Sequence, residues 1–209
     1  MRILRILTVL VVPAVLAACG SGDQAEPAAD AEMATVAAAL SCTLQGATMA
    51  EAMERPSPLR QVSFSVGGHE GLLCYGAPSA NERLVMGELV PFGEVWRLGA
   101  NEPTAIHLTG PAQVGGVSLD AGTYSLYAVP GESEWTFFIN TSVERWGIPI
   151  GDDVRATEVG SFTAPVEATD GPVETFTLGF EASEDGTMGD VVMEWENTRV
   201  KFPVHPAMP

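Results

Sequence analysis

Apolar and polar residues alternate along much of the chain after residue 58. Val62, Phe64 and Val66 alternate with serines, and this two-residue period predicts a strand with one buried face. The pair Gly67-Gly68 follows directly and favours a tight turn. Residues 69–75 then bring a second apolar segment. The first structural unit expected from the pattern is therefore a β-hairpin.

Similar segments recur at intervals of roughly 8–12 residues, with turn residues between them, a spacing typical of antiparallel sandwiches and barrels. No long helical period interrupts the series, so alternating strand–helix units are not expected. Residues 84–90 predict a short strand or a single helical turn. The fold class that follows is mainly β, an antiparallel β-sandwich (jelly-roll-like) or a flattened barrel with few short helices. Strands are expected at residues 105–109, 113–114, 117–119, 123–129, 134–140, 155–164, 174–181, 191–196 and 198–202.

The first 18 residues have the layout of a secretory signal peptide. Arg2 and Arg5 supply positive charge, an apolar run follows, and small residues precede Cys19. This order is typical of export signals, and the apolar run is too short for a membrane-spanning helix. The run Leu16-Ala17-Ala18-Cys19 also resembles the lipobox of bacterial lipoproteins, which implies cleavage before Cys19 and lipid attachment to its sulfur. The alternative is an ordinary signal peptide with a chance cysteine.

Three parts of the chain follow from these signals. Residues 1–18 form the signal peptide, residues 19–55 a lipid-anchored tether with a possible short helix, and residues 56–205 a β-sandwich domain. The start of the tether is small, acidic and rich in Ala and Pro, as in flexible linkers. Helical propensity is present at residues 33–40 and 48–54, and Pro56 ends the second segment.

The net charge of the chain is −17. A protein this acidic is repelled by nucleic-acid phosphates and by anionic lipid headgroups, so nucleic acid is a poor candidate partner. The charge fits a soluble domain outside the cytoplasm. We therefore expect an exported protein of the cell envelope, lipid-anchored on the periplasmic side or at the outer membrane.

Two cysteines remain if Cys19 carries lipid. An exported, oxidising compartment favours a disulfide between Cys42 and Cys74. The alternative is a pair of free thiols, with Cys74 buried in an apolar strand.

Motifs spread over most of residues 57–203 resemble a bacterial family known as domain of unknown function 2911. The resemblance implies an exported, mostly β domain and no established activity. It rests on these segments in order: Ser57-Pro58-Leu59, Val62-Ser63-Phe64, residues 87–102 with Phe92-Gly93-Glu94-Val95-Trp96-Arg97-Leu98-Gly99-Ala100-Asn101-Glu102, Val114-Gly115-Gly116-Val117, Ala121-Gly122-Thr123-Tyr124-Ser125-Leu126, Glu134-Trp135-Thr136, Trp146-Gly147 and residues 194–200.

The densest group of polar side chains lies in the glycine-rich stretch 87–104. Trp96, Arg97, Asn101 and Glu102 occur within seven positions of one another. An arginine can bind a carboxylate or phosphate through paired hydrogen bonds, and an indole can stack on a ligand. These four residues are the candidate ligand-binding site. The alternative is structural: Arg97 pairs with a neighbouring glutamate such as Glu94 or Glu102, and Asn101 binds turn backbone.

Other chemistry has weaker support. His69 and His107 lie 38 positions apart and match no metal-ligand spacing, and no Gly-x-Ser-x-Gly nucleophile motif occurs. No metal, cofactor or catalytic residue is therefore predicted. Tryptophans could form a glycan- or peptide-stacking platform, for which the loop residue Trp146 is the best exposed candidate.

Two functional hypotheses result. The first is an exported, lipid-anchored β-sandwich that acts as a ligand-binding or envelope-accessory module, with a small molecule, glycan or peptide as ligand and the membrane as a partner through the lipid on Cys19. The alternative is a hydrolase of an envelope polymer or small acid that uses Glu102 or His107 as acid or base.

Overall fold

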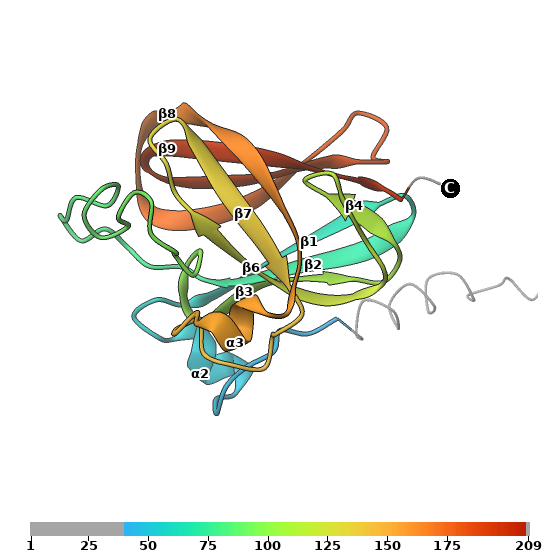
Figure 1. The fold of residues 1–209 in the computed structure, drawn as a ribbon, viewed down its shortest axis with the longest axis horizontal. Coiled ribbons are helices and arrows are strands. Elements are labelled where there is room, and N and C mark those ends of the chain that lie inside the picture. Colours follow the sequence, from blue (N-terminus) through green and yellow to red (C-terminus); the bar gives the residue numbers. More distant parts are fainter. Residues whose placement is uncertain (1–39, 208–209) are drawn as a thin grey trace, which may run out of the picture.

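The computed structural model describes residues 40–207 and has nine antiparallel strands in one sheet (Figure 1). The spatial order is β1-β2-β3-β6-β7-β8-β9-β4-β5. It is a meander of neighbouring strands in which the β4–β5 hairpin crosses over to pair with β9. The strands are β1 (Leu59–Val66), β2 (His69–Gly76), β3 (Ala100–Leu108), β4 (Ala112–Val114), β5 (Val117–Leu119), β6 (Gly122–Val129), β7 (Glu134–Asn140), β8 (Glu158–Ala182) and β9 (Gly189–Pro206).

The prediction of a mainly antiparallel β fold with few short helices is confirmed. The two helices of the described chain are α2 (Met49–Met53) and α3 (Asp152–Arg155). The predicted Gly67-Gly68 turn is present, and Gly115-Gly116 forms a second turn between β4 and β5. All four glycines have positive φ, as tight hairpin turns demand. The sheet does not close into a barrel, since β1 and β5 remain its two edges.

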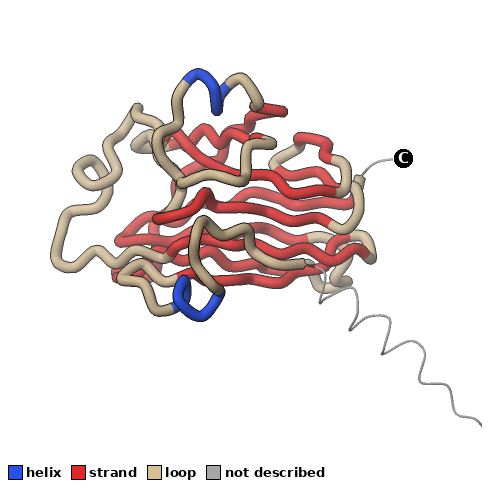
Figure 2. The backbone as a smooth tube through the Cα atoms, turned by 90° about the horizontal axis from the view of Figure 1, so that it is seen from below, coloured by secondary structure: helices blue, strands red, loops and turns tan. Residues whose placement is uncertain are grey.

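The sheet folds into two layers because β8 passes from one layer to the other. Its first part, up to Pro165, pairs with β7, and from Val166 onward it pairs with β9. Two irregularities of register, between Ala168 and Thr177, accompany this change of partner, as bulges commonly do where a strand bends. The two layers lie face to face in Figures 1 and 2.

The main core fills the space between the layers. Phe64 of β1 stacks on Phe180 of β8 at 4.8 Å, and Phe137 of β7 meets Phe202 of β9 at 5.1 Å. Strand β2 contributes Leu73 and Tyr75 to this core. Such alternating residues from facing strands are what the two-residue period predicts.

A second, smaller core lies on the other face of β2. Leu72 and Cys74 point away from the main core and pack beneath residues 40–58, which we call the N-terminal strap. The strap contains α2, which begins with a capping box between Thr48 and Glu51. Residues 40–55, expected to belong to the tether, thus lie against the sheet. The predicted helix at residues 33–40 falls almost wholly outside the described residues.

Several element boundaries differ from those expected. Residues 84–90 form irregular turns rather than a strand or a helix. Strand β3 begins at Ala100, five residues early, which places Asn101 and Glu102 in the strand. The segment expected to be strand from residue 155 starts with the last turn of α3. Asp170-Gly171-Pro172, although typical of a turn, lies within the long strand β8.

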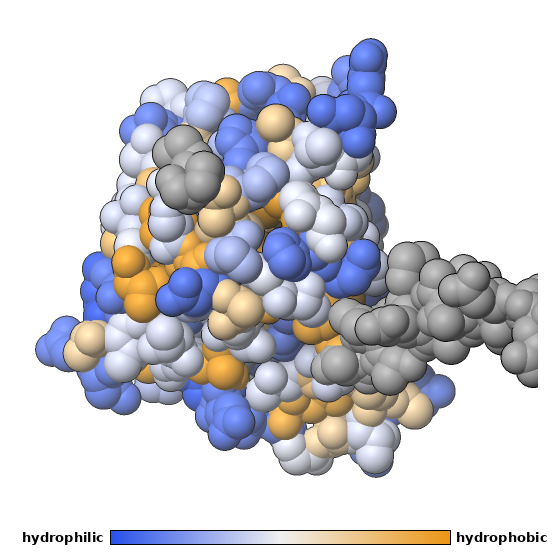
Figure 3. Space-filling view, turned by 90° about the vertical axis from the view of Figure 1, so that its right-hand side faces the viewer, coloured by the Kyte–Doolittle hydropathy of each residue, from blue (hydrophilic) through white to orange (hydrophobic). Residues whose placement is uncertain are grey.

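Residues 77–99 form an irregular loop that projects beyond the strand ends, at the left in Figures 1 and 2. The opposite side of the molecule shows hydrophobic residues in small groups between hydrophilic ones (Figure 3). Neither of the helices within residues 40–207 has the length and hydropathy needed to cross a membrane.

Candidate functional site

Trp96 lies at the base of the projecting loop and is fixed by backbone pairing. Its amide donates to the carbonyl of Ala128 at 2.7 Å and its carbonyl accepts from the Ala128 amide at 2.9 Å. The indole packs edge-on against Trp135 and Phe176 and stacks on Trp195. Trp96 is only half-buried, so its remaining surface is available at the edge of the core.

Arg97 follows and is also half-buried. Its Nε donates to the carbonyl of Gly99 at 3.1 Å, which fixes the guanidinium. No carboxylate within the described residues forms an ion pair with it. Burial lowers the pKa of Arg97 from its usual value, since desolvation disfavours the charged form. Arg97 is therefore a partly desolvated cation that lacks a counterion from residues 40–207.

The backbone around Arg97 departs from the usual conformations. Leu98 is fully buried and has φ 56°, and Asn101 has φ 64°. Positive φ is rare for a large residue such as leucine, and local strain of this kind costs of order 1–3 kcal/mol. The carbonyl of Leu98 accepts a short hydrogen bond from the Thr104 hydroxyl, which helps to hold this conformation.

The position of Gly147 accounts for the glycine in the Trp146-Gly147 motif. A Cβ at this position would lie 2.8 Å from Cδ of Arg97 and 2.8 Å from the carbonyl oxygen of Asn101. The Gly147 amide donates to that same carbonyl at 2.7 Å. The absence of a side chain at position 147 therefore lets loop 141–151 approach the Arg97 stem.

A groove of about 350 Å³ opens beside Trp96 and Arg97. This is at the small end of the range for ligand pockets. Its walls come from the strap, the projecting loop, the start of β3, loop 141–151 and β9. The lining residues are Ser57, Pro78, Arg83, Leu89, Val95, Trp96, Arg97, Gly99, Ala100, Ile148 and Trp195.

Asn101 and Glu102 hold the strap rather than line this groove. The Asn101 amide Nδ2 donates to the carbonyl of Ser57 at 2.8 Å. Glu102 is buried and accepts from Arg55 Nη1 at 2.7 Å and from the Gln45 amide at 3.0 Å. Of the four predicted residues, the structure thus brings Trp96 and Arg97 together at the groove. The glutamate pairs with Arg55 and not with Arg97.

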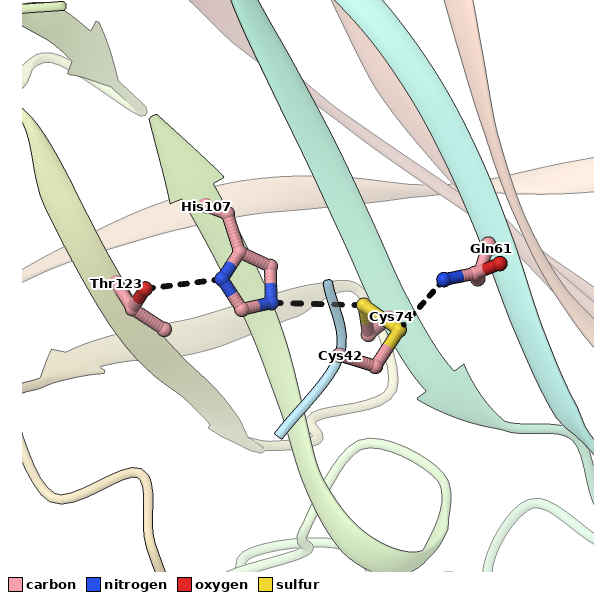
Figure 4. The surroundings of a disulfide bond; sticks show 5 residues. All are labelled: Cys42, Gln61, Cys74, His107 and Thr123. Atoms are coloured by element: carbon pink, nitrogen blue, oxygen red, sulfur yellow. Dashed lines mark hydrogen bonds between the residues drawn. A yellow bond between two sulfur atoms is a disulfide. The ribbon is translucent and has the colours of Figure 1, made fainter. Parts of the chain in front are cut away.

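His107 is buried between β2 and β6 (Figure 4). Its Nδ1 is 2.9 Å from the Thr123 hydroxyl and its Nε2 is 3.5 Å from Sγ of Cys74. Burial lowers its pKa from the usual value. Both ring nitrogens face protein atoms, so His107 has no free nitrogen for a substrate in this arrangement.

Cys42 and Cys74 form a disulfide with Cα atoms 5.7 Å apart. Cys42 Sγ also accepts from Gln61 Nε2 at 3.0 Å (Figure 4). The bond ties the strap to β2, on the same side as the contacts of Glu102. Cys19, the predicted lipid attachment residue, lies outside the described residues.

The remaining tryptophans do not share one exposed surface. Trp135 and Trp195 are buried in the core, while Trp146 is 48% exposed on its loop, with the Arg55 guanidinium 5.5 Å from its ring centre. Between residues 40 and 207, His, Cys, Asp and Glu side chains form no group of three or more that could hold a metal ion.

Sequence reasoning missed Arg83, Leu89 and Ile148 as groove residues. Arg83 and Leu89 belong to the same projecting loop as Arg97, and Ile148 reaches the groove from loop 141–151. The one available signal was the apolar character of Val95 and Ile148, which lie close in sequence to Trp96 and Trp146.

A comparison with models of known protein families assigns the chain to a family. Residues 57–204 match the family model described as "Protein of unknown function (DUF2911)". The chain belongs to the DUF2911 family. Neither a curated protein nor a solved structure matches it.

The DUF2911 match begins at Ser57 and therefore includes every residue that lines the groove. Cys42 and Arg55 of the strap precede it. Two of the sequence motifs approach each other in the fold, because Gly147 of Trp146-Gly147 abuts the side chain of Arg97.

Proposed function

We propose that this protein is an exported, lipid-anchored module of the cell envelope that binds a small amphipathic acid in the groove beside Trp96 and Arg97. The observation that carries the proposal is the Arg97 guanidinium, half-buried and without a carboxylate partner in the described chain. The chain has 27 acidic residues against 10 Lys and Arg. A cation that remains unpaired in such an excess of acids is available for an external anion.

Desolvating a charge without a partner is costly, and an incoming carboxylate offsets that cost. The planar guanidinium offers paired N–H donors that match a carboxylate. Because Arg97 Nε is already bound to the carbonyl of Gly99, the side chain is held in place before a ligand arrives. Little side-chain entropy would be lost on binding.

The rest of the groove favours an apolar body on the ligand. Leu89, Val95 and Ile148 line the groove and are 39%, 40% and 58% exposed. Large exposed apolar residues that gather in one place often mark a binding site. Trp96 adds an aromatic surface suited to stacking. The positive φ of Leu98 also fits a site at which local strain is retained.

Export and lipid attachment are supported by the signal-like residues 1–18 and by Cys19. The Cys42–Cys74 disulfide agrees with an oxidising compartment. Mass spectrometry of the membrane fraction tests this part. We expect a diacylglycerol on Cys19 and loss of membrane association in Cys19→Ala, and an unmodified mature N-terminus would contradict it.

The hydrolase alternative gains no support from the geometry. Glu102 is ion-paired to Arg55 and His107 is enclosed between Thr123 and Cys74. Neither lines the groove at Arg97, and a general acid or base must reach the substrate.

Isothermal titration with octanoate and 4-phenylbutyrate tests the binding proposal, with 4-phenylbutanamide as the uncharged counterpart. We expect saturable binding of the acids that weakens by about tenfold or more in Arg97→Ala, since a hydrogen-bonded charge pair is worth about 1.5–3 kcal/mol. Arg97→Lys keeps the charge without the planar fork and should bind with intermediate affinity.

Arg60→Ala is the matched control, because Arg60 is exposed on β1 and likewise lacks an ion pair among the described residues. It should bind like the wild type. Absence of binding by both acids at millimolar concentration would overturn the proposal, as would equal affinities of Arg97→Ala and Arg60→Ala.

A further inference from the structure

We infer that the groove selects a diacid, with Arg83 as the anchor for a second carboxylate. This inference rests on the proposed function and specifies the class of ligand. Arg83 lines the same groove as Arg97, and it too forms no ion pair with a carboxylate of the described chain. Two arginines in one groove of a chain with net charge −17 are more than a single carboxylate needs.

The Arg83 guanidinium is held in a defined position although the residue is exposed. Its Nε donates to the carbonyl of Ala80 at 2.8 Å and its Nη2 donates to the carbonyl of Ser79 at 2.9 Å. Nη1 has no hydrogen-bond partner within residues 40–207. Two of its three nitrogens therefore fix the side chain, and the third can bind a ligand.

The backbone that accepts these bonds is itself anchored to the second layer. The Ser79 hydroxyl is 2.8 Å from the hydroxyl of Thr175 in β8. The Ala80 amide donates to the carbonyl of Glu174 at 2.8 Å. Arg83 is thus held by a segment that is itself hydrogen-bonded to β8, and this gives the preorganisation that selective sites require.

Two of the glutamates near Arg83, Glu174 and Glu196, are bound by backbone amides and form no ion pair with it. Glu174 accepts from the Asn81 amide at 2.8 Å, and Glu196 accepts from the Met86 amide at 3.1 Å. Both carboxylates stabilise the projecting loop through its backbone.

Apolar side chains lie in the same groove as the two cations. Leu89, Val95 and Trp96 are among its apolar lining residues. A ligand with an acid at each end and an apolar middle satisfies both kinds of surface. An α,ω-dicarboxylic acid is the simplest member of this class, and a groove of about 350 Å³ has room for a short one.

Isothermal titration with matched pairs of acids tests the inference. The diacids butanedioate, hexanedioate, octanedioate and decanedioate vary the distance between carboxylates, and octanoate is the monoacid reference. We expect at least one diacid to bind about tenfold more tightly than octanoate. In Arg83→Ala the ratio of diacid affinity to octanoate affinity should fall to within about twofold.

The outcomes separate this inference from the proposed function. Wild-type protein that binds octanoate through Arg97 but prefers no diacid would overturn the second anchor alone. Equal weakening of octanoate and diacid by Arg83→Ala would do the same. Absence of binding by every acid would overturn both proposals. Arg83→Gln, which keeps a donor without the charge, should behave like Arg83→Ala, and Arg60→Ala should behave like the wild type.

Discussion

Removal of the Cys42–Cys74 disulfide measures how firmly the N-terminal strap is fixed to the sheet. The two cysteines are 32 positions apart, and both are buried. In the chain-entropy model, a cross-link that closes a loop of this length stabilises the fold by about 4 kcal/mol. For a domain of this size, each kcal/mol changes the melting temperature by about 2–4 °C. The double variant Cys42→Ala/Cys74→Ala should therefore melt about 10 °C below the wild type.

Thermal and urea unfolding followed by circular dichroism supply this measurement, with Thr43→Ala as a control in the same segment. Hydrogen exchange should also accelerate across residues 40–55 in the double variant, because the strap then depends on Glu102 and Asn101 alone among the polar contacts described above. A melting temperature within about 2 °C of the wild type would refute the reasoning. It would mean that the disulfide does not restrict the unfolded chain enough to stabilise the fold.

Three further variants probe the site and the strap. Gly147→Ala should lower octanoate affinity several-fold in titration and destabilise the fold by about 1–3 kcal/mol in urea unfolding, because the new Cβ meets the Arg97 stem. The control Gly179→Ala, which has open space around the new Cβ, should change neither quantity. Glu102→Gln should lower the free energy of unfolding in urea by about 2–3 kcal/mol, less than the loss of a fully buried ion pair, because its partner Arg55 is 19% exposed. Unchanged octanoate affinity would support a structural role for Glu102, and lost affinity would contradict it. Burial lowers the pKa of His107 below 6.5, so the unfolded chain binds more protons than the folded protein, and the free energy of unfolding should fall as pH decreases from 6.5 through the folded-state pKa. His107→Leu should flatten this pH dependence between pH 7.5 and 5. An unaltered slope would exclude His107 as its source.

Local patterns predicted most of the sheet because they depend on neighbours in sequence. The alternation around Phe64 and the Gly67-Gly68 pair determine the first hairpin without reference to distant residues. The long bend in β8 was not predictable in this way. Residues 170–172 have turn chemistry, yet pairing with β9 on either side keeps them within the strand. Tertiary contacts decide such cases.

The candidate site was predictable only in part for the same reason. Trp96 and Arg97 are adjacent in sequence, and a single loop carries both of them to the groove. The partner of Glu102 is 47 positions away, in the strap, and no local rule indicates that pairing. Arg83 lies 14 positions before Arg97 in the projecting loop and Ile148 lies in loop 141–151, so their places beside Arg97 depend on how these two loops fold and pack.

Side-chain NMR during a titration with 4-phenylbutyrate tests the binding of an acid beside Arg97 most directly. The Nε–Hε resonance of Arg97 and the indole N–H resonance of Trp96 report on the groove atom by atom. The proposal predicts that both resonances shift along a single saturating curve, while the Nε–Hε resonance of Arg60, an exposed residue of β1, stays in place. Saturation with unchanged Arg97 and Trp96 resonances, or no saturation at all, would contradict it.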